Sequence, residues 1–351
     1  MKILKVLSRF TSSRIFPSLL VLALILLFNV IVQPGFLSVE YRDGRLAGGL
    51  ITILNRSVPV MILAIGMTLV IATAGIDLSV GTMVAVSGAV AILLIRGGDV
   101  MPTAYTSTPL PLVIIITLLT GAAFGLWNGF LVTKLGVPPF IATLILMVTG
   151  RGITHVMSDG GNMATSHTPF REIAGGITVS IPNQIWIALF IFLLIWFLTR
   201  RTAFGLFVES IGINKSAATY SGIKSNQTLL IVYMLSALCA SIVGILTVST
   251  TLVLEPLVTG QNMELSAIVA VVLGGTSLKG GRFSLAGSCI GAIILMALTQ
   301  TMFFYGVPVE FSLAIQAMVI ALIIVVQSPM TRYLITSRFS RKSAKREVST
   351  K

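Results

Sequence analysis

The stretch Leu63-Ala-Ile-Gly-Met-Thr-Leu-Val-Ile-Ala-Thr-Ala-Gly-Ile-Asp-Leu-Ser-Val-Gly81 decides how the chain folds. Its first half is a continuous apolar run, which a glycine-bounded break at residues 75–81 interrupts before a second apolar run begins. Uncharged runs of this kind are typical of helices that cross a lipid bilayer. The stretch therefore predicts two membrane helices, 58–73 and 80–95, joined by a short non-helical break.

The composition of the whole chain supports a membrane protein. Of its 351 residues, 55% are hydrophobic and only 10% are charged, whereas about a quarter of the residues in soluble domains are charged. The mean hydropathy is +1.00. One or two water-soluble cores cannot hide this much apolar surface, so an ordinary soluble domain is excluded.

Apolar runs recur along the chain and predict about ten membrane spans. The candidate spans are 16–32, 58–73, 80–95, 110–132, 139–157, 185–198, 229–248, 265–273, 285–302 and 311–326. The first run follows several basic residues but precedes no small-residue cleavage pattern, so we expect an uncleaved anchor. We predict an all-α polytopic membrane protein with an N-terminal cytoplasmic segment 1–15, a transmembrane domain 16–327 and a basic tail 328–351.

The distribution of charge predicts the orientation. If the N-terminus is cytoplasmic and the spans alternate, the lysine and arginine excess falls almost entirely on the cytoplasmic side. Both termini are therefore predicted to be cytoplasmic. This placement accounts for the net charge of +13 without a nucleic-acid partner. The basic tail also suits anionic lipid or RNA, but we favour a role in fixing the topology.

A second glycine-rich break, residues 274–281, matches the first in layout 199 residues later, which predicts two weakly related halves. Corresponding breaks point to a translocation pathway, because unwound backbone at membrane depth is tolerated only beside protein or water. A plain tight turn on the cytoplasmic side is the alternative. Glycines 121, 125 and 129 recur every fourth residue, a spacing that predicts close helix packing.

Polar side chains at the breaks and in nearby spans are candidates for a substrate pathway. Asp77 and Ser79 precede a helix, where capping of free backbone N–H groups is the simpler role. A proton-carrying aspartate would need a titratable partner in another span, and the sequence offers none. Trp127 and Asn128 combine an aromatic face with an amide that suits a sugar, although a lone tryptophan more often faces lipid or core. The predicted pathway residues are Asp77, Ser79, Ser87, Trp127, Asn128, Thr143 and Thr276.

The longest predicted cytoplasmic connection, residues 199–227, has features of a docking loop. Asn214 is suited to cap a short helix, which Gly222 would end in a left-handed turn. A short helix on this side suits a groove in a partner protein, and a simple connecting loop is the alternative. The predicted coupling residues are Glu209, Gly212, Asn214, Ala217, Ala218 and Gly222.

Signatures of catalysis are missing from the sequence. It has no Gly-x-x-x-x-Gly-Lys-Ser/Thr phosphate loop and no His-Glu-x-x-His, and His155 and His167 lack metal-ligand spacing. We therefore expect no enzyme activity, no metal and no cofactor in this chain. Any energy for transport must come from another subunit or from an ion gradient.

The stretch 63–81 resembles the signature of monosaccharide ABC-importer permeases, the ribose, xylose and galactofuranose group. Other pieces that resemble this family are Asn128-Gly129, Pro139-Phe-Ile-Ala-Thr-Leu144, Gly150-Arg-Gly152, the 212–222 loop, Glu264-Leu-Ser-Ala-Ile268, Gly274-Gly275 and Gly280-Gly281. Asp43-Gly-Arg-Leu46, Ile53-Leu-Asn-Arg56 and Glu209 are most similar to the galactofuranose type. The resemblance covers residues 45–330. The family has a second glycine in its loop where this chain has Ile213.

This resemblance implies a multi-pass permease of the cell inner membrane that moves a pentose or hexose into the cytoplasm. It also implies two cytoplasmic ATPase subunits, a periplasmic sugar-binding protein, and a second permease copy or a sister permease as partners. An ion-coupled secondary transporter is the first alternative, although such a protein needs intramembrane acids or a cation site. A membrane enzyme is the second alternative, and the missing catalytic groups weigh against it.

Overall fold

The computed structural model describes residues 16–32, 35–42, 44–96, 108–308, 311, 314–318, 320, 321 and 325. The described helices are α2 (Phe16–Val32), α3 (Gly49–Ala72), α4 (Val80–Arg96), α5 (Leu110–Thr133), α6 (Pro139–Met157), α7 (Thr168–Gly175), α8 (Asn183–Arg201), α9 (Phe204–Ile213), α10 (Lys215–Tyr220), α11 (Ser225–Thr251), α12 (Met263–Leu273) and α13 (Leu285–Phe304). The predicted N-terminal segment 1–15 and basic tail 328–351 lie outside the described residues.

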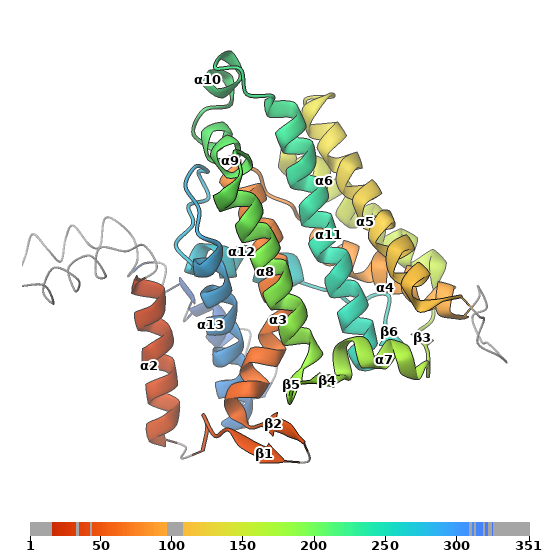
Figure 1. Cartoon of the computed structure of the whole chain (residues 1–351), viewed down its shortest axis with the longest axis vertical. Helices are drawn as coiled ribbons and strands as arrows, with labels where there is room; N and C mark the ends of the chain where they lie inside the picture. Colours follow the sequence, from red (N-terminus) through yellow and green to blue (C-terminus); the bar gives the residue numbers. More distant parts are fainter. Residues whose placement is uncertain are drawn as a thin grey trace, which may run out of the picture.

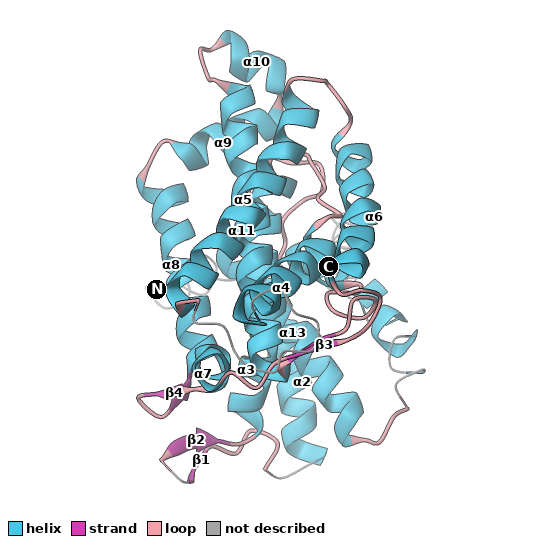
Figure 2. Ribbon diagram, turned by 90° about the vertical axis from the view of Figure 1, so that its right-hand side faces the viewer, coloured by secondary structure: helices cyan, strands magenta, loops and turns pink. Residues whose placement is uncertain are grey.

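Short strands pair near one end of the molecule. The antiparallel pairs among the described residues are β1 (Glu40–Arg42) with β2 (Arg45–Ala47), β3 (Met163–Ala164) with β6 (Val253–Leu254), and β4 (Ile177–Thr178) with β5 (Ile181–Pro182). Figures 1 and 2 show β1, β2, β4 and α7 toward this end, and α9 and α10 at the opposite one. We call these the hairpin end and the α10 end.

The predicted membrane helices are present where the structure describes the chain. Six helices (α3, α5, α6, α8, α11 and α13) are long and apolar enough to cross a bilayer, and α2, α4, α9 and α12 are shorter apolar helices. Each predicted span up to 285–302 falls on a described helix, and 311–326 is described only at residues 311, 314–318, 320, 321 and 325. A polytopic helical membrane protein is confirmed, while the number of ten spans stays a prediction.

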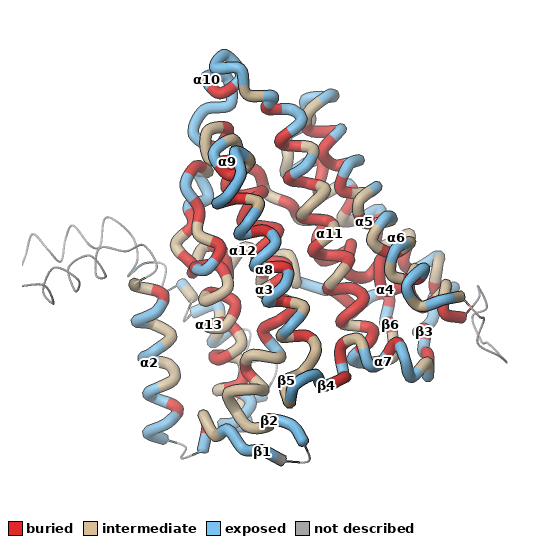
Figure 3. Tube along the Cα trace, in the orientation of Figure 1, coloured by how far each residue is buried: buried red, intermediate tan, exposed pale blue. Residues whose placement is uncertain are grey.

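The spanning helices form an inner and an outer set. The buried share of the most apolar window is 67% for α11 and 61% for α13, against 22% for α5 and 28% for α6. α11 packs against α5, α4 and α3, and α13 packs against α3, α12 and α2. Figure 3 shows the same division along the Cα trace, with long buried runs on the inner helices. The outer helices keep apolar faces that suit lipid or another membrane chain.

Glycines set the close packing of α5 on α11. Cβ atoms added to Gly125 and Gly129 would lie 2.7 Å from the Tyr233 carbonyl oxygen and 3.0 Å from the Leu230 Cα atom. Backbones this close require residues without side chains, and such contacts account for much of the association between membrane helices. The packing role predicted from the glycine spacing is confirmed.

Both predicted breaks are non-helical. α3 ends at Ala72 and α4 begins at Val80, while α12 ends at Leu273 and α13 begins at Leu285. α3 begins earlier than predicted, because Pro59 lies inside this helix without ending it. We call the connections 73–79 and 274–284 the first turn and the second turn.

Candidate functional site

The C-terminal end of α9 joins the two turns at the α10 end. A Cβ atom on Gly212 would overlap both the Ala72 carbonyl oxygen and the Gly281 backbone nitrogen. Those two groups are themselves bonded, since the Gly281 N–H donates to the Ala72 oxygen at 2.8 Å. One residue of the predicted coupling loop therefore contacts the end of α3 and the second turn together.

The second turn also requires glycine at the two residues that meet Gly212. Gly280 and Gly281 have φ angles of 83° and 88°, in the left-handed region that glycine adopts without a steric penalty. A Cβ atom on Gly280 would lie 2.8 Å from the Gly212 carbonyl oxygen and 2.9 Å from the Ala74 Cβ atom. Backbone meets backbone here, so movement of α9 passes to both turns with little slack.

The short helix predicted in the coupling loop is confirmed as α10. The Asn214 side-chain oxygen accepts a hydrogen bond from the Ala217 N–H at 2.9 Å, which satisfies a free donor of the first turn of the helix. Ala218 is buried against Ile211 and Leu229. Gly222, with a φ of 87°, provides the left-handed residue that follows the helix.

Large apolar side chains are exposed on α9 and α10. Tyr220 is 92% exposed, Ile213 is 74% exposed and Leu206 is 65% exposed. Ala217 is also exposed and leaves the side of α10 smooth. Projecting apolar side chains beside a smooth helix face are typical of a surface that docks into a groove of another protein.

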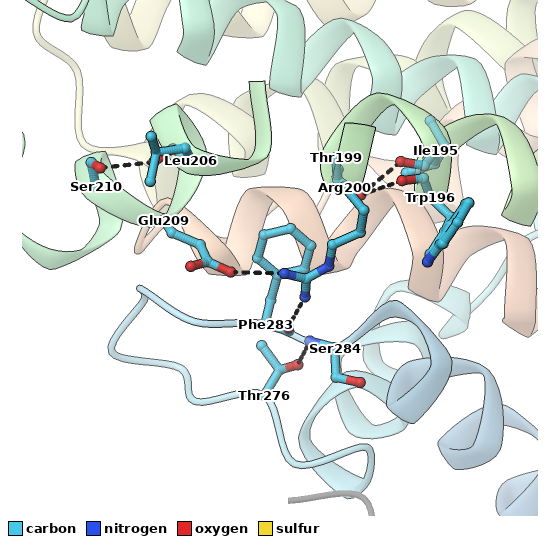
Figure 4. A network of polar contacts seen from close by, with 10 residues as sticks. All are labelled: Ile195, Trp196, Thr199, Arg200, Leu206, Glu209, Ser210, Thr276, Phe283 and Ser284. Atoms are coloured by element: carbon cyan, nitrogen blue, oxygen red, sulfur yellow. Dashed lines mark hydrogen bonds and ion pairs between the residues drawn. The ribbon is translucent and has the colours of Figure 1, made fainter. Parts of the chain in front are cut away.

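Glu209 forms an ion pair with Arg200 at the end of α8, and Arg200 in turn bonds to the second turn (Figure 4). Its carboxylate lies 3.6 Å from the Arg200 guanidinium, measured between Oε1 and Nη1. Arg200 Nη2 donates to the Phe283 carbonyl oxygen at 3.0 Å, and the guanidinium carbon lies 5.2 Å from the centroid of the Phe283 ring. The sequence did not single out Arg200, because it reads as one more cytoplasmic basic residue.

The predicted pathway residues Asp77, Ser79 and Asn128 meet in one buried network. Asp77 Oδ1 accepts from the Ser79 N–H at 3.0 Å and from the Ser79 hydroxyl at 2.6 Å, and its Oδ2 accepts from the Ser236 hydroxyl at 2.9 Å. Asn128 Nδ2 donates to the Ser79 hydroxyl oxygen at 2.9 Å. The network therefore joins the first turn to α5 and α11. The backbone N–H that Asp77 accepts from belongs to Ser79, one residue before α4 begins, so this contact orders the first turn and does not cap a backbone N–H of the helix.

The other predicted pathway residues lie apart from this network. Ser87 donates to Ser241 Oγ at 2.8 Å between α4 and α11. Thr143 donates to the Ile76 oxygen at 3.2 Å, so it also supports the first turn. Thr276 accepts from the Ser284 N–H at 3.3 Å in the second turn. Trp127 is 52% exposed and stacks on Phe130, so it lies on the outer surface of α5. A pathway role for these residues stays a prediction.

Arg151 on α6 holds the segment that leads into α12, a contact that the sequence did not reveal. Its Nη1 donates to the Thr259 carbonyl oxygen at 2.6 Å and to the Pro256 carbonyl oxygen at 3.3 Å. Nearby, a Cβ atom on Gly81 would lie 2.6 Å from the Gly260 carbonyl oxygen. The segment 256–260, which leads into α12, is thus packed against α4 and bonded to α6.

Comparison with known proteins places the chain in a transporter family. Residues 49–325 match the family model described as branched-chain amino acid transport system / permease component. The chain is 41% identical over 312 residues to the galactofuranose transporter permease protein YtfT of Escherichia coli K12, covering 89% of each protein. It is 40% identical over 339 residues to the fructose import permease protein FruF of Bifidobacterium longum, covering 95% of this chain and 92% of that protein.

A third relative is the ribose import permease protein RbsC of Escherichia coli K12, 35% identical over 325 residues, with 91% of this chain and 96% of that protein covered. No solved structure matches the chain significantly. The family model spans most of the chain, and the relatives are aligned over nearly their whole lengths. The chain belongs to this family of multi-pass membrane permeases, as the permease component of a transport system.

Proposed function

We propose that this chain is the membrane-spanning subunit of an ATP-driven importer that carries a neutral monosaccharide from the periplasm to the cytoplasm. The substrate class rests on the relatives, which are named as galactofuranose, fructose and ribose permeases. Galactofuranose leads the candidates, because that relative has the highest identity of the three. The observation that carries the coupling part of the proposal is the contact of Gly212 with Ala72 and Gly281.

ATP hydrolysis occurs on separate subunits in this proposal. Two cytoplasmic ATPase subunits bind the exposed surface around Tyr220 and Ile213 at the α10 end. The chain carries no cofactor of its own. When the ATPase subunits close on ATP, they move α10 and α9 together, and Gly212 passes this movement to the first and second turns. The helices that these turns join, α3 with α4 and α12 with α13, then change their separation.

The sugar crosses between the inner helices in this proposal. Ser87, Asn128, Thr143 and Thr276 carry uncharged polar groups that exchange hydrogen bonds with hydroxyls and hold no charge. Each of them bonds to a protein group in this conformation. When the helices separate, these groups are freed one after another and form weak hydrogen bonds with the sugar. Weak bonds suit passage of the sugar better than tight binding does. Selection of the sugar is left to a periplasmic binding protein.

The complete transporter has further components. A second copy of this chain or a sister permease covers part of the exposed apolar surface of the outer helices, and lipid covers the rest. The chain lies in the cell inner membrane with both termini cytoplasmic and ten spans. No nucleic acid takes part.

Uptake into proteoliposomes tests the proposal. The permease is reconstituted with the ATPase and binding protein encoded beside it, and radiolabelled D-galactose, D-fructose, D-ribose and L-leucine are supplied outside with ATP inside. We expect uptake of one of the sugars and not of leucine. Uptake should require the ATPase and survive a protonophore, because no proton gradient drives the cycle.

Two results would contradict the proposal. Sugar uptake that collapses with the protonophore while ATP is maintained, and that needs no ATPase subunit, would favour the ion-coupled alternative. Uptake of leucine instead of the sugars would assign the chain to the substrate that the family description names.

A further inference from the structure

Arg200 links its own helix to two other segments, α9 and the second turn, and the second turn lies far away in the sequence. It stands in the last turn of α8, pairs with Glu209 on α9, and bonds to the Phe283 carbonyl oxygen in the second turn. Figure 4 shows its guanidinium beside the Phe283 ring, with dashed lines to Glu209 and to Phe283. The position of this one side chain therefore depends on α8, α9 and the second turn together.

We propose that Arg200 is a positioning residue for transport, which holds the second turn to α9 while α9 moves. The proposal rests on the proposed function, because it assigns Arg200 to the same path from the ATPase subunits to the membrane helices. It adds an attractive link to the steric link that Gly212 provides.

The two links lie on one face of α9. Glu209 and Gly212 are three residues apart, so their side chains would point to the same side of the helix. The Gly212 contact is steric, and a steric contact transmits a push but not a pull. The Arg200 link is attractive and directional, so it draws the second turn after α9 when α9 withdraws. A transport cycle needs both strokes.

Arginine suits this position for a chemical reason. Nη1 faces the Glu209 carboxylate, Nη2 donates to the Phe283 oxygen, and the guanidinium carbon lies over the Phe283 ring. A lysine ammonium is a compact point charge that cannot make all three contacts in this geometry. Arg200→Lys should therefore keep the charge at this end of α8 and lose most of the link.

Stability of the fold is a weaker explanation for these contacts. The Arg200 and Glu209 side chains are 47% and 23% exposed, and partly exposed ion pairs contribute little to stability. The second turn has its own support, because Gly280 and Gly281 adopt left-handed conformations and Gly281 bonds to Ala72. Removing the Arg200 side chain leaves that turn folded but detached from Glu209.

Arg201 provides a matched control. It is the next residue in α8, carries the same charge at the same end of the helix, and is exposed. Its guanidinium lies 5.7 Å from the centroid of the Trp196 ring, which belongs to α8 itself. Arg201→Ala therefore removes an equal charge without touching α9 or the second turn.

The test measures sugar uptake and ATP hydrolysis in the same proteoliposomes, with the full transporter and whichever of D-galactose, D-fructose and D-ribose the wild type transports. For Arg200→Ala we expect ATP hydrolysis within about twofold of wild type and a fall of about tenfold in sugar moved per ATP. Arg200→Lys should show most of this loss. Arg201→Ala should keep the wild-type ratio, and melting temperatures of all variants in detergent report folding.

Three results would overturn the assignment. An unchanged sugar-to-ATP ratio in Arg200→Ala shows that the link carries no coupling. An equal loss in Arg201→Ala assigns the effect to charge, and a large fall in the melting temperature of both Arg200 variants assigns it to folding. If the wild type itself moves no sugar with ATP, the proposed function fails, and this assignment fails with it. If the wild type couples transport to ATP and Arg200→Ala does so equally well, only this assignment fails.

Discussion

Gly212 lies so close to the Ala72 carbonyl oxygen that no β-carbon fits between α9 and the end of α3. The same oxygen accepts the Gly281 N–H, so the end of α3 meets the second glycine-rich break at this point. Gly212 lies near the end of α9, which stops at Ile213, and the exposed helix α10 begins two residues later at Lys215. In the proposed function, this contact passes movement of the 199–227 loop to the end of α3 and to the second turn.

Gly212→Ala should disrupt this point. The added methyl group meets backbone atoms, which cannot rotate out of its way, so α9 must shift at a cost of about 1–3 kcal/mol. We expect ATP-driven sugar uptake to be lost or strongly reduced. Uptake in proteoliposomes and the melting temperature in detergent check the prediction.

Gly152→Ala is the matched control for that variant. Gly152 also lies in a helix, and a Cβ atom there would meet nothing within 4 Å. The change should be neutral or stabilising by about 0.5–1 kcal/mol, since alanine loses less entropy than glycine in a helix. Equal sugar uptake by the two variants would show that transport does not depend on the contact of Gly212 with Ala72.

Tyr220→Ala should weaken binding of the ATPase subunit without affecting the fold. The side chain is 92% exposed, so its removal changes the surface of α10 and almost nothing inside the protein. Co-purification with the tagged ATPase subunit measures the effect. Tyr41→Ala, at the hairpin end and 70% exposed, should leave this binding intact. Undiminished binding by Tyr220→Ala would show that the ATPase subunit docks on another surface.

Single cysteines should report the orientation of the chain. Val179 is 78% exposed on the side of the hairpin end, and Tyr220 is exposed at the α10 end. In whole spheroplasts, a membrane-impermeant maleimide should label Val179→Cys and should label Tyr220→Cys only after permeabilisation. Cys239 is 3% exposed, and substitution of Cys239 and Cys289 by alanine removes any background. Labelling of both positions from one side would contradict the topology.

Ser236→Ala should destabilise the protein. The Ser236 hydroxyl donates to Asp77 Oδ2 in a fully buried site, and its loss leaves a carboxylate oxygen without that partner. The expected cost is about 1–3 kcal/mol, seen as a lower melting temperature. Ser266→Ala serves as the control, because Ser266 bonds only to the Asn262 carbonyl one turn earlier in its own segment. A melting temperature equal to that of the control would show that Asp77 finds another donor.

Much of the fold could be predicted from the sequence, because each membrane helix corresponds to one local run of apolar residues. Each apolar run between glycine or charged segments carries its own evidence for a span, and Asn214 with Gly222 marks both ends of α10. α9 was missed, although Phe204, Phe207, Val208 and Ile211 repeat with helical spacing. The run is short and lies inside a predicted loop.

The site was less predictable, because it depends on contacts between distant segments. No local pattern shows that Gly212 meets Ala72 and Gly281, or that Arg200 reaches Phe283. Asp77, Ser79 and Asn128 were selected as polar residues in apolar surroundings, and the structure brings them together. Trp127 and Asn128 were selected together as an aromatic face and an amide that suit a sugar. Adjacent residues of a helix point in different directions, so Trp127 is exposed and Asn128 is buried.

The central claim is that ATP-driven movement reaches the second turn through α9. Spin labels on Lys279→Cys in that turn and Val179→Cys toward the hairpin end, in a chain without Cys239 and Cys289, measure the movement directly in the assembled transporter. We predict that the distance between the labels changes when vanadate traps nucleotide in the ATPase subunits, and that Gly212→Ala abolishes the change. An unchanged distance in the otherwise wild-type chain, or the same change with Gly212→Ala present, would contradict the claim.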